Sequence, residues 1–327
     1  VVIRVADNYS TGEPPGVVRA FDVHTGKLAW AWDPGNPALT GVPPEGQTYT
    51  RGTPEGQTYT RGTPNVWSAM SYDAKLNLIY LPTGNATPDF FGGERTALDD
   101  KYSSSIVAVD AATGQVRWHF QTTHHDLWDF DLPSQPLLYD LPDGKGGTTP
   151  VLVQTSKQGM IFMLNRETGE PVAKVEERPV PVGNVKGERY SPTQPYSVGM
   201  PMIGNQTLTE SDMWGATPID LLLCRIQFKE MRHQGVFTPP GEDRSLQFPG
   251  SLGGMNWGSV SVDPNNSLMF VNDMRLGLAN YMVPREKVAK DASGIEMGIV
   301  PMEGTPFGAM RERFLSPLGI PCQKPPF

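Results

Sequence analysis

Three shortages in this sequence each exclude a class of protein. Its only cysteines, Cys224 and Cys322, lie too far apart to form the CxxC motif of a metal or haem site. No apolar run reaches the length of about 18 residues that a membrane-spanning helix needs. The net charge is -8 and no cluster of Lys or Arg is visible, which argues against a nucleic-acid-binding protein.

The two cysteines by themselves leave two interpretations open. They are either two buried thiols or a long-range disulfide formed in an oxidising compartment, and the residues favour neither. A disulfide closing so long a loop would contribute at best about 4–5 kcal/mol to stability.

The composition indicates a globular protein rich in turns. The 327 residues include 35 glycines and 32 prolines, while 38% of the residues are hydrophobic. A chain of this length can bury a sizeable core, and so much glycine and proline predicts few long helices.

A repeated unit organises the first half of the chain. Each copy has an apolar strand, then Asp or Asn, two further residues and Thr-Gly; in two copies a second strand ends in Trp. The copies are Val18–Trp30 (VRAFDVHTGKLAW), Ile106–Trp118 (IVAVDAATGQVRW) and the weaker Ile161–Glu170 (IFMLNRETGE). The Thr-Gly turn suits a hairpin, and the Trp can pack between neighbouring sheets. Recurring hairpins favour a β-propeller over a plain β-sandwich.

Other segments carry weaker signals. The decamer EGQTYTRGTP occurs twice in tandem, at 45–54 and 55–64, and we expect it in a surface loop. Residues 176–205 are rich in Pro and Gly and predict a long excursion. Residues 211–232 are the best helical candidate, with apolar residues at Ile219, Leu222, Leu223, Ile226 and Phe228.

Two motifs carry a family resemblance. Residues 67–88 (WSAMSYDAKLNLIYLPTGNATP) place a Trp before a predicted strand and polar turn residues after it. Residues 122–132 read TTHHDLWDFDL. Both resemble signatures of the bacterial quinoprotein dehydrogenases, which carry pyrroloquinoline quinone (PQQ). Over essentially the whole chain, the sequence resembles the periplasmic domain of the membrane-bound quinoprotein glucose dehydrogenases.

The resemblance implies an all-β fold, an eight-bladed propeller of which this chain supplies a partial set of blades with short helical excursions. Residues 1–327 would form part of a single PQQ-binding domain, with the remaining blades and an N-terminal membrane segment outside this sequence. It also implies the periplasmic face of the bacterial inner membrane, and this compartment favours the disulfide.

Asp129 and Lys157 are the candidate catalytic residues. Strand alternation would place Asp129 and Asp131 on one face, although three carboxylates at 126, 129 and 131 also suit a solvated loop, and a Lys after a strand is commonly solvated. The resemblance implies that Asp129 is the general base. It also implies that Lys157 approaches the quinone oxygens, where a cation stabilises developing negative charge.

Trp67 is the candidate floor for the planar cofactor, because an indole has a wide apolar face; the alternative is an ordinary core Trp. Asn256 and Asn272 lie in segments that resemble cofactor-contacting loops, and Lys157 completes the predicted cofactor contacts. His124 and His125 are adjacent, so on a strand they would point to opposite faces and could not share a metal. We expect them to be structural or to line the substrate site.

The resemblance further implies a divalent cation, Mg²⁺ or Ca²⁺, bound beside the quinone. Asp7 aligns with an acidic metal-site residue of the glucose dehydrogenases, and Asn85 and Thr87 align with positions near the same ion. Oxygen ligands of this kind suit either cation.

The predicted activity is PQQ-dependent oxidation of an aldose, D-glucose to gluconolactone, with electrons passed to ubiquinone through a membrane segment. One alternative is a quinoprotein alcohol dehydrogenase, but the chain lacks the adjacent cysteine pair and the CxxCH haem motif found in that branch. The other is a non-catalytic propeller scaffold, which would not need both motifs together with the Lys.

Overall fold

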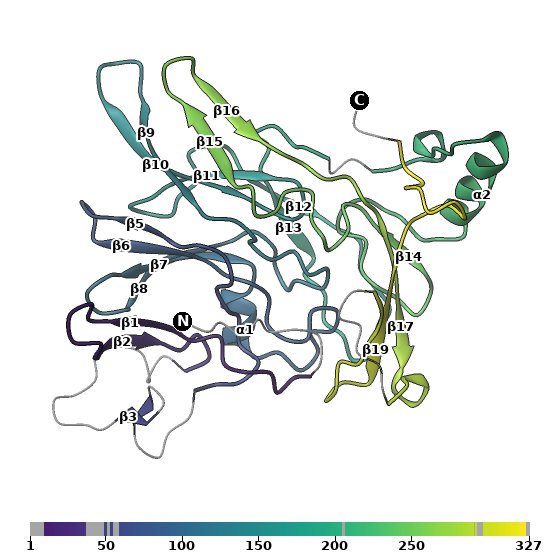
Figure 1. The fold of residues 1–327 in the computed structure, drawn as a ribbon, viewed down its shortest axis with the longest axis horizontal. Coiled ribbons are helices and arrows are strands. Elements are labelled where there is room, and N and C mark those ends of the chain that lie inside the picture. Colours follow the sequence, from purple (N-terminus) through teal and green to yellow (C-terminus); the bar gives the residue numbers. More distant parts are fainter. Residues whose placement is uncertain are drawn as a thin grey trace.

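The computed structural model describes residues 10–36, 49–50, 53–54, 59–204, 207–290, 292 and 297–324. Within them the chain forms seven antiparallel sheets and a few short helices (Figure 1). The strands are β1 (Val18–Phe21), β2 (Leu28–Trp32), β3 (Tyr49–Thr50), β4 (Thr53–Pro54), β5 (Ser71–Asp73), β6 (Leu78–Pro82), β7 (Ser105–Asp110), β8 (Val116–Gln121), β9 (Leu137–Pro142), β10 (Thr148–Thr155), β11 (Ile161–Asn165), β12 (Glu176–Pro179), β13 (Thr193–Tyr196), β14 (Ser245–Gln247), β15 (Val260–Asp263), β16 (Leu268–Val271), β17 (Leu278–Pro284), β18 (Gly298–Val300) and β19 (Phe307–Arg313). The helices are α1 (Ala97–Tyr102), α2 (Pro218–Lys229) and the 3₁₀ turns η2 (Glu210–Asp212) and η3 (Arg285–Lys287).

The three sequence repeats share one turn. In the first copy the Asp22 carboxylate accepts hydrogen bonds from the backbone N–H groups of His24 and Thr25. Asp110 closes the β7–β8 turn in the same way, and the Asn165 amide oxygen does so after β11. The side chain therefore supplies the acceptor that bends the chain, and the following Gly supplies the left-handed backbone.

Each Trp of the repeat lies against the turn of the next copy. Trp30 is 1% exposed and its indole N–H donates to the Ala111 carbonyl at 2.8 Å. A Cβ added to Gly114, whose φ is +73°, would lie 2.5 Å from the Trp30 ring, and Gly169 has the same relation to Trp118. Glycine is thus required twice over, by backbone conformation and by the approach of the indole.

Sheets stack face to face because the central strands are apolar on both sides. On β7, Val107 and Val109 pack toward β1–β2, whereas Ile106 and Ala108 pack toward the β9–β10–β11 sheet. Strand β10 repeats the pattern, since Leu152 faces the β5–β8 sheet and its two neighbouring valines face β15–β16. This double-sided alternation produces the row of sheets on one side of the molecule in Figure 1 and matches a propeller's blade-on-blade packing.

The predicted helix at 211–232 is longer than the observed one. Helix α2 begins only after Thr217, whose hydroxyl caps the Asp220 N–H, and ends at Lys229. Gly215, where a Cβ would lie 2.2 Å from the Leu221 backbone nitrogen, and the helix-starting Pro218 set this later start. The side of α2 that contacts the protein carries Cys224 and Asp220. The predicted apolar residues Ile219, Leu222, Leu223 and Ile226 are exposed instead, and only Phe228 packs inward.

Cys224 and Cys322 form a disulfide. It joins α2 to the segment that follows β19, and the two lie side by side in Figure 1. The bond closes a loop with a sequence separation of 98 residues. This pairing agrees with the interpretation that the family resemblance favoured.

The prediction that the duplicated decamer forms a surface loop is wrong for the part that the structure describes. Most of the first copy lies outside the described residues. At the end of the second copy, Gly62, Thr63 and Pro64 are buried. Gly62 donates to the Glu13 carbonyl and Thr60 donates to Asp33, so the segment packs on the N-terminal part of the chain. Among the described helices none is long and apolar enough to cross a bilayer.

The Trp–Gly contact between repeats predicts the stability of two glycine variants. Replacing Gly114 by Ala should cost about 1 kcal/mol for the left-handed backbone and a further 1–3 kcal/mol for displacing Trp30. The free energy of unfolding, from urea denaturation followed by tryptophan fluorescence, measures the loss.

Gly26→Ala is the matched control, because Gly26 occupies the same turn position with φ +69° and has nothing within 4 Å of an added Cβ. This variant should lose only the part of the unfolding free energy that comes from the left-handed backbone, about 1 kcal/mol. Equal losses for the two variants would show that the indole contact contributes nothing.

Candidate functional site

The candidate site lies at one end of the sheets, in the loops that connect their strands. Neighbouring strands of the β5–β8 sheet are antiparallel, so the start of β5, the end of β6, the start of β7 and the end of β8 share one end. Trp67 precedes β5, Asn85 and Asp89 follow β6, and the segment 122–131 follows β8. The topology therefore brings residues from distant parts of the sequence together.

A buried lysine lies at the centre of this end. Lys157 follows β10, and its Nζ donates to Asp129 Oδ1 at 2.6 Å and lies 3.6 Å from Asp131 Oδ2. The same ammonium lies 5.7 Å from the centroid of the Trp67 ring. The Trp67 indole N–H in turn donates to Asp131 Oδ2 at 2.9 Å. The structure thus brings the predicted residues Trp67, Asp129 and Lys157 into one cluster.

A third carboxylate completes the cluster. Asp89, Asp129 and Asp131 place carboxylate oxygens within 4.8 Å of one another. Burial, opposed by the charge of Lys157 and supported by the charge of Asp131, raises the pKa of Asp129 to about 7. Burial, followed by the charges of Asp129 and Asp131, holds the pKa of Asp89 well above its usual value.

The charges of Asp129 and Asp131 also act on Lys157. Burial alone would lower the pKa of Lys157, but the two carboxylates outweigh this and raise it. The lysine therefore stays protonated, and Asp129 becomes a carboxylate basic enough to exchange a proton near neutral pH.

Of the three predicted metal residues, Asp7, Asn85 and Thr87, the structure describes the last two, which differ in how close they lie to the acidic cluster. Asn85 is 3% exposed, its backbone N–H donates to Asp131 Oδ1 at 2.7 Å, and its side-chain oxygen has no partner among the described residues. Thr87 donates its backbone N–H, and at 3.5 Å its hydroxyl, to the Gly62 carbonyl. Asp7 lies outside the described residues. Asn85 therefore lies beside the acidic cluster, whereas Thr87 bonds to Gly62 of the duplicated segment.

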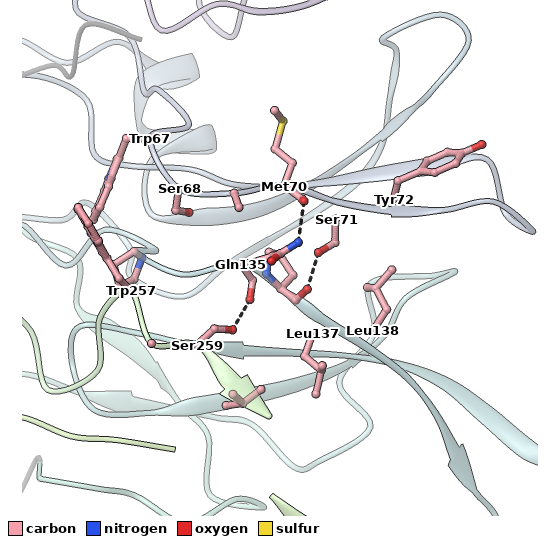
Figure 2. A pocket seen from close by; sticks show the side chains of 15 residues that line it. Trp67, Ser68, Met70, Ser71, Tyr72, Gln135, Leu137, Leu138, Trp257 and Ser259 are labelled. Atoms are coloured by element: carbon pink, nitrogen blue, oxygen red, sulfur yellow. Dashed lines mark hydrogen bonds between the residues drawn. The ribbon is translucent and has the colours of Figure 1, made fainter. Parts of the chain in front are cut away.

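A cavity of about 770 Å³ reaches the cluster at Trp67, while Asp129 and Lys157 are not among its lining residues. Figure 2 shows the rings of Trp67 and Trp257 together at one end of it, and their centroids are 6.3 Å apart. Gln135 and Ser259 line its polar side, where the Gln135 amide donates to the Met70 carbonyl and the Ser259 hydroxyl donates to the Gln135 carbonyl. The cavity therefore has an aromatic end and a neutral polar side.

Asn256 and Asn272 lie next to Trp257. The Asn256 amide donates to the Leu252 carbonyl and accepts from the Trp257 N–H, so both ends of the amide bond within its own loop. Asn272 is exposed, and its side-chain oxygen would lie 2.1 Å from a Cβ added to Gly258. Both predicted cofactor residues thus border the Trp257 loop.

The predicted strand around Asp129 is absent. Residues 122–136 lie outside any strand, and Asp129 has φ +58°, so the alternation argument for residues 129 and 131 is wrong. His124 and His125 nevertheless diverge. His124 contacts Gln121 and Glu177, while His125 contacts Asp100 and Glu188. The two rings therefore point to different partners, as expected, although the segment is a loop and not a strand.

Sequence reasoning missed Asp89 and Trp257 as members of the site. Asp89 immediately follows the Gly-Asn-Ala-Thr-Pro turn. Its closeness to Asp129 and Asp131 of another loop is visible only in the folded structure. Trp257 adjoins the predicted Asn256, and its 77% exposure marks it as more than a core residue.

Comparison with known proteins places the chain in one family. Residues 1–327 match the family described as "PQQ: Glucose/ethanol/alcohol dehydrogenase, beta-propeller domain". The chain is 53% identical over 331 aligned residues to the quinate/shikimate dehydrogenase (quinone) of Acinetobacter baylyi, covering 99% of this chain and 40% of that protein. It is 45% identical over 328 residues to the quinoprotein glucose dehydrogenase of Escherichia coli, covering 98% of this chain and 40% of that protein. The chain therefore spans about two fifths of the length of these relatives.

A solved structure supports the fold. The quinohemoprotein alcohol dehydrogenase from Pseudomonas putida HK5 superposes with a TM-score of 0.50 at 26% identity, over 84% of this chain and 35% of that one. The family resemblance of the two sequence motifs and the propeller fold are confirmed together.

His125 predicts a specific pH dependence of stability. Both ring nitrogens face carboxylates, Asp100 at 2.7 Å and Glu188 at 3.0 Å, so the ring donates twice and is favoured as imidazolium. Burial pulls the pKa of His125 down, but these hydrogen bonds outweigh it and raise the pKa above its ordinary value. The folded state then binds more protons, so this stabilisation is complete below about pH 6.5 and is lost as pH rises through the folded pKa. The difference in unfolding free energy between the wild type and His125→Gln should shrink accordingly, by about 1.4 kcal/mol per unit of pKa shift.

His233 is the matched control with the opposite sign. Its ring donates to the Leu246 carbonyl and accepts from the Leu208 N–H, which requires the neutral form, and burial lowers the pKa of His233. The corresponding difference for His233→Gln should grow as pH rises toward about 6.5. A His125 difference that is flat or that grows with pH would contradict the assignment of an imidazolium.

Proposed function

Since the chain belongs to the PQQ-dependent glucose/ethanol/alcohol dehydrogenase β-propeller family, we propose that it oxidises a ring hydroxyl of quinate or shikimate and passes the electrons to a quinone. The observation that carries the proposal is the Lys157–Asp129 pair beside Trp67. A base, a cation and an aromatic face in one site are what removal of a proton and a hydride from an alcohol requires of a protein that binds a planar quinone.

The residues of the site fit PQQ. Trp67 is only partly buried and borders the cavity, so an indole face is accessible to a flat ring. The protonated Lys157 would interact with the oxygens of the quinone, and the loop 252–258 approaches the same lysine, since a Cβ at Gly253 would lie 2.8 Å from Lys157 Cγ. Trp67 and Lys157 are therefore the residues that would bind the cofactor, with Asn256 and Asn272 proposed at the margin.

The same end of the sheets fits a divalent cation. Three carboxylates converge there, and the buried Asn85 oxygen beside them has no partner within the described part of the chain. Carboxylate and amide oxygens are the ligands that Mg²⁺ and Ca²⁺ prefer. We propose Asn85, Asp89 and Asp131 as the source of ligands, with Asp7 and Thr87 as further proposed contributors.

The protein's own part in the reaction is proton transfer and charge stabilisation. PQQ with its cation supplies, when bound, the two-electron oxidant for the carbinol carbon. Lys157 bonds to Oδ1 of Asp129 and leaves Oδ2 to accept the substrate hydroxyl proton. Lys157 also offsets the negative charge that gathers in the site, and burial of both side chains, 7% and 16% exposed, strengthens these interactions by excluding water.

Two substrate classes remain in competition. The identity of 53% to a protein named for quinate and shikimate supports those substrates over an aldose, for which the corresponding identity is 45%. Glucose, oxidised to gluconolactone, is the second candidate. A primary alcohol receives less support, and a non-catalytic scaffold receives the least, because a buried ion pair is costly without a chemical use.

The cellular setting is proposed on the same basis. The disulfide suits an oxidising compartment, which supports the periplasmic face of the bacterial inner membrane. Ubiquinone is proposed as the electron acceptor, reached through a membrane segment, and residues 1–327 as part of a single PQQ-binding propeller domain.

Replacing the base tests the proposed chemistry. Asp129→Asn in the full-length protein should lower kcat by at least about 100-fold, because an amide cannot accept the hydroxyl proton. PQQ binding, followed by the cofactor's absorbance, should change little. Turnover close to wild type in this variant would contradict the role of Asp129.

Substrate preference is tested by reconstitution with PQQ and Mg²⁺ or Ca²⁺, followed by assay with an artificial acceptor dye. Quinate and shikimate should give kcat/KM values at least about 10-fold above glucose, a difference of about 1.4 kcal/mol in transition-state binding. Faster oxidation of glucose would select the aldose candidate, and no oxidation of either class would count against both.

A further inference from the structure

The segment around Asp129 is curled about a second carboxylate. Asp126 is fully buried, and its Oδ1 accepts the Trp128 backbone N–H at 2.8 Å. Its Oδ2 accepts the Phe130 backbone N–H at 2.8 Å and the Ser104 hydroxyl at 2.6 Å. The two backbone bonds come from the residues on either side of Asp129.

This arrangement accounts for the unusual backbone of Asp129. Its φ of +58° is a left-handed conformation that costs a non-glycine residue free energy and persists only where the surroundings require it. The N–H groups of residues 128 and 130 both bond to the Asp126 carboxylate, and the left-handed residue lies between them. From this turn the Asp129 carboxylate reaches Lys157, which it meets at 2.6 Å.

The rest of the segment is immobilised by packing. The Trp128 indole donates to the Thr238 carbonyl, and Gln247 of β14 donates to the Trp128 carbonyl. Trp128 and Phe130 stack, and both pack edge-on against Phe237. The flanking side chains are therefore buried on one side, and the Asp126 carboxylate sets the direction of the residue between them.

Asp126 also joins this segment to the β6 end of the site. Its backbone carbonyl accepts from the Asn85 side-chain amide at 3.1 Å and from the Arg95 guanidinium at 2.5 Å. The same residue thus fixes Asp129 through its carboxylate and Asn85 through its carbonyl.

We propose that Asp126 is a positioning residue for the reaction, which sets the left-handed conformation of Asp129 and so aims the base at the substrate hydroxyl. It touches neither substrate nor cofactor. The inference rests on the proposed function, because it assigns Asp126 a role only through the base.

The test compares variants of the full-length protein loaded with PQQ and Mg²⁺. In Asp126→Asn an amide NH₂ replaces one of the acceptor oxygens, so one of the two backbone N–H groups loses its partner. Misplacement of a reacting group by about 1 Å can cost about 100-fold, and kcat per bound PQQ should fall by about that factor. KM and PQQ affinity should stay within about 3-fold, because the cofactor and substrate contacts lie elsewhere.

Two further variants keep the test decisive. Ser104→Ala removes only the hydroxyl that orients Asp126 and should lower kcat less than Asp126→Asn does; it decides the outcome if Asp126→Asn does not fold. Asp110→Asn is the matched control, since Asp110 also accepts backbone N–H groups of a turn and Asn165 performs that task in the third repeat. It should keep the wild-type kcat.

The outcomes separate the two proposals. A folded Asp126→Asn with kcat near wild type, or a parallel loss of PQQ binding and kcat, overturns the positioning role. If Asp126→Asn does not fold, a wild-type kcat in Ser104→Ala overturns it as well. Retained activity in Asp129→Asn contradicts the role of Asp129 as base, and with it the positioning role of Asp126. The proposed function itself is overturned only if the reconstituted wild type oxidises neither quinate, shikimate nor glucose.

Discussion

The buried ammonium of Lys157 is the interaction on which the site depends. A charge that is 7% exposed needs an immediate partner, and Asp129 supplies one at 2.6 Å, with Asp131 at 3.6 Å. Burial keeps the pKa of Asp129 raised against the opposing charge of Lys157, and three carboxylates converge on the same place. Removing Lys157 would leave buried carboxylates without their ammonium partner, and removing Asp129 would leave Lys157 only the more distant Asp131.

The stacked sheets give this cluster its rigidity. Trp67 and Asp129 flank the β5–β8 sheet and Lys157 follows β10 of the neighbouring sheet, so the distances between these residues depend on the spacing of the two sheets. The contact of Trp118 with the Gly169 turn joins these two sheets, and the contact of Trp30 with the Gly114 turn joins β1–β2 to the β5–β8 sheet. A structural feature of the sequence repeat thereby sets the geometry of a site that contains none of the repeat's residues.

The sequence predicts the propeller, the repeat turns and the three central residues because each depends on local spacing or on a family motif. It could not predict Asp89 as a neighbour of Asp129, because they are 40 positions apart and meet only when β6 and β8 end together. Nor could it predict the left-handed Asp129, since alternation suggested a strand and the Asp126 carboxylate imposes a turn. Helix α2 shows the same limit: its apolar periodicity is real, but the disulfide and the capping Thr217 turn most of those residues outward.

The central claim is that a planar quinone lies on Trp67 with the Asp129–Lys157 pair at its edge. A crystal structure of the full-length protein with PQQ and Mg²⁺ tests it most directly. We expect the PQQ ring in van der Waals contact with the Trp67 indole, Lys157 Nζ within hydrogen-bond reach of its quinone oxygens, and the Asp129 carboxylate at the same edge of the ring. PQQ bound elsewhere, with Trp67, Asp129 and Lys157 unchanged and out of contact with it, would contradict the claim.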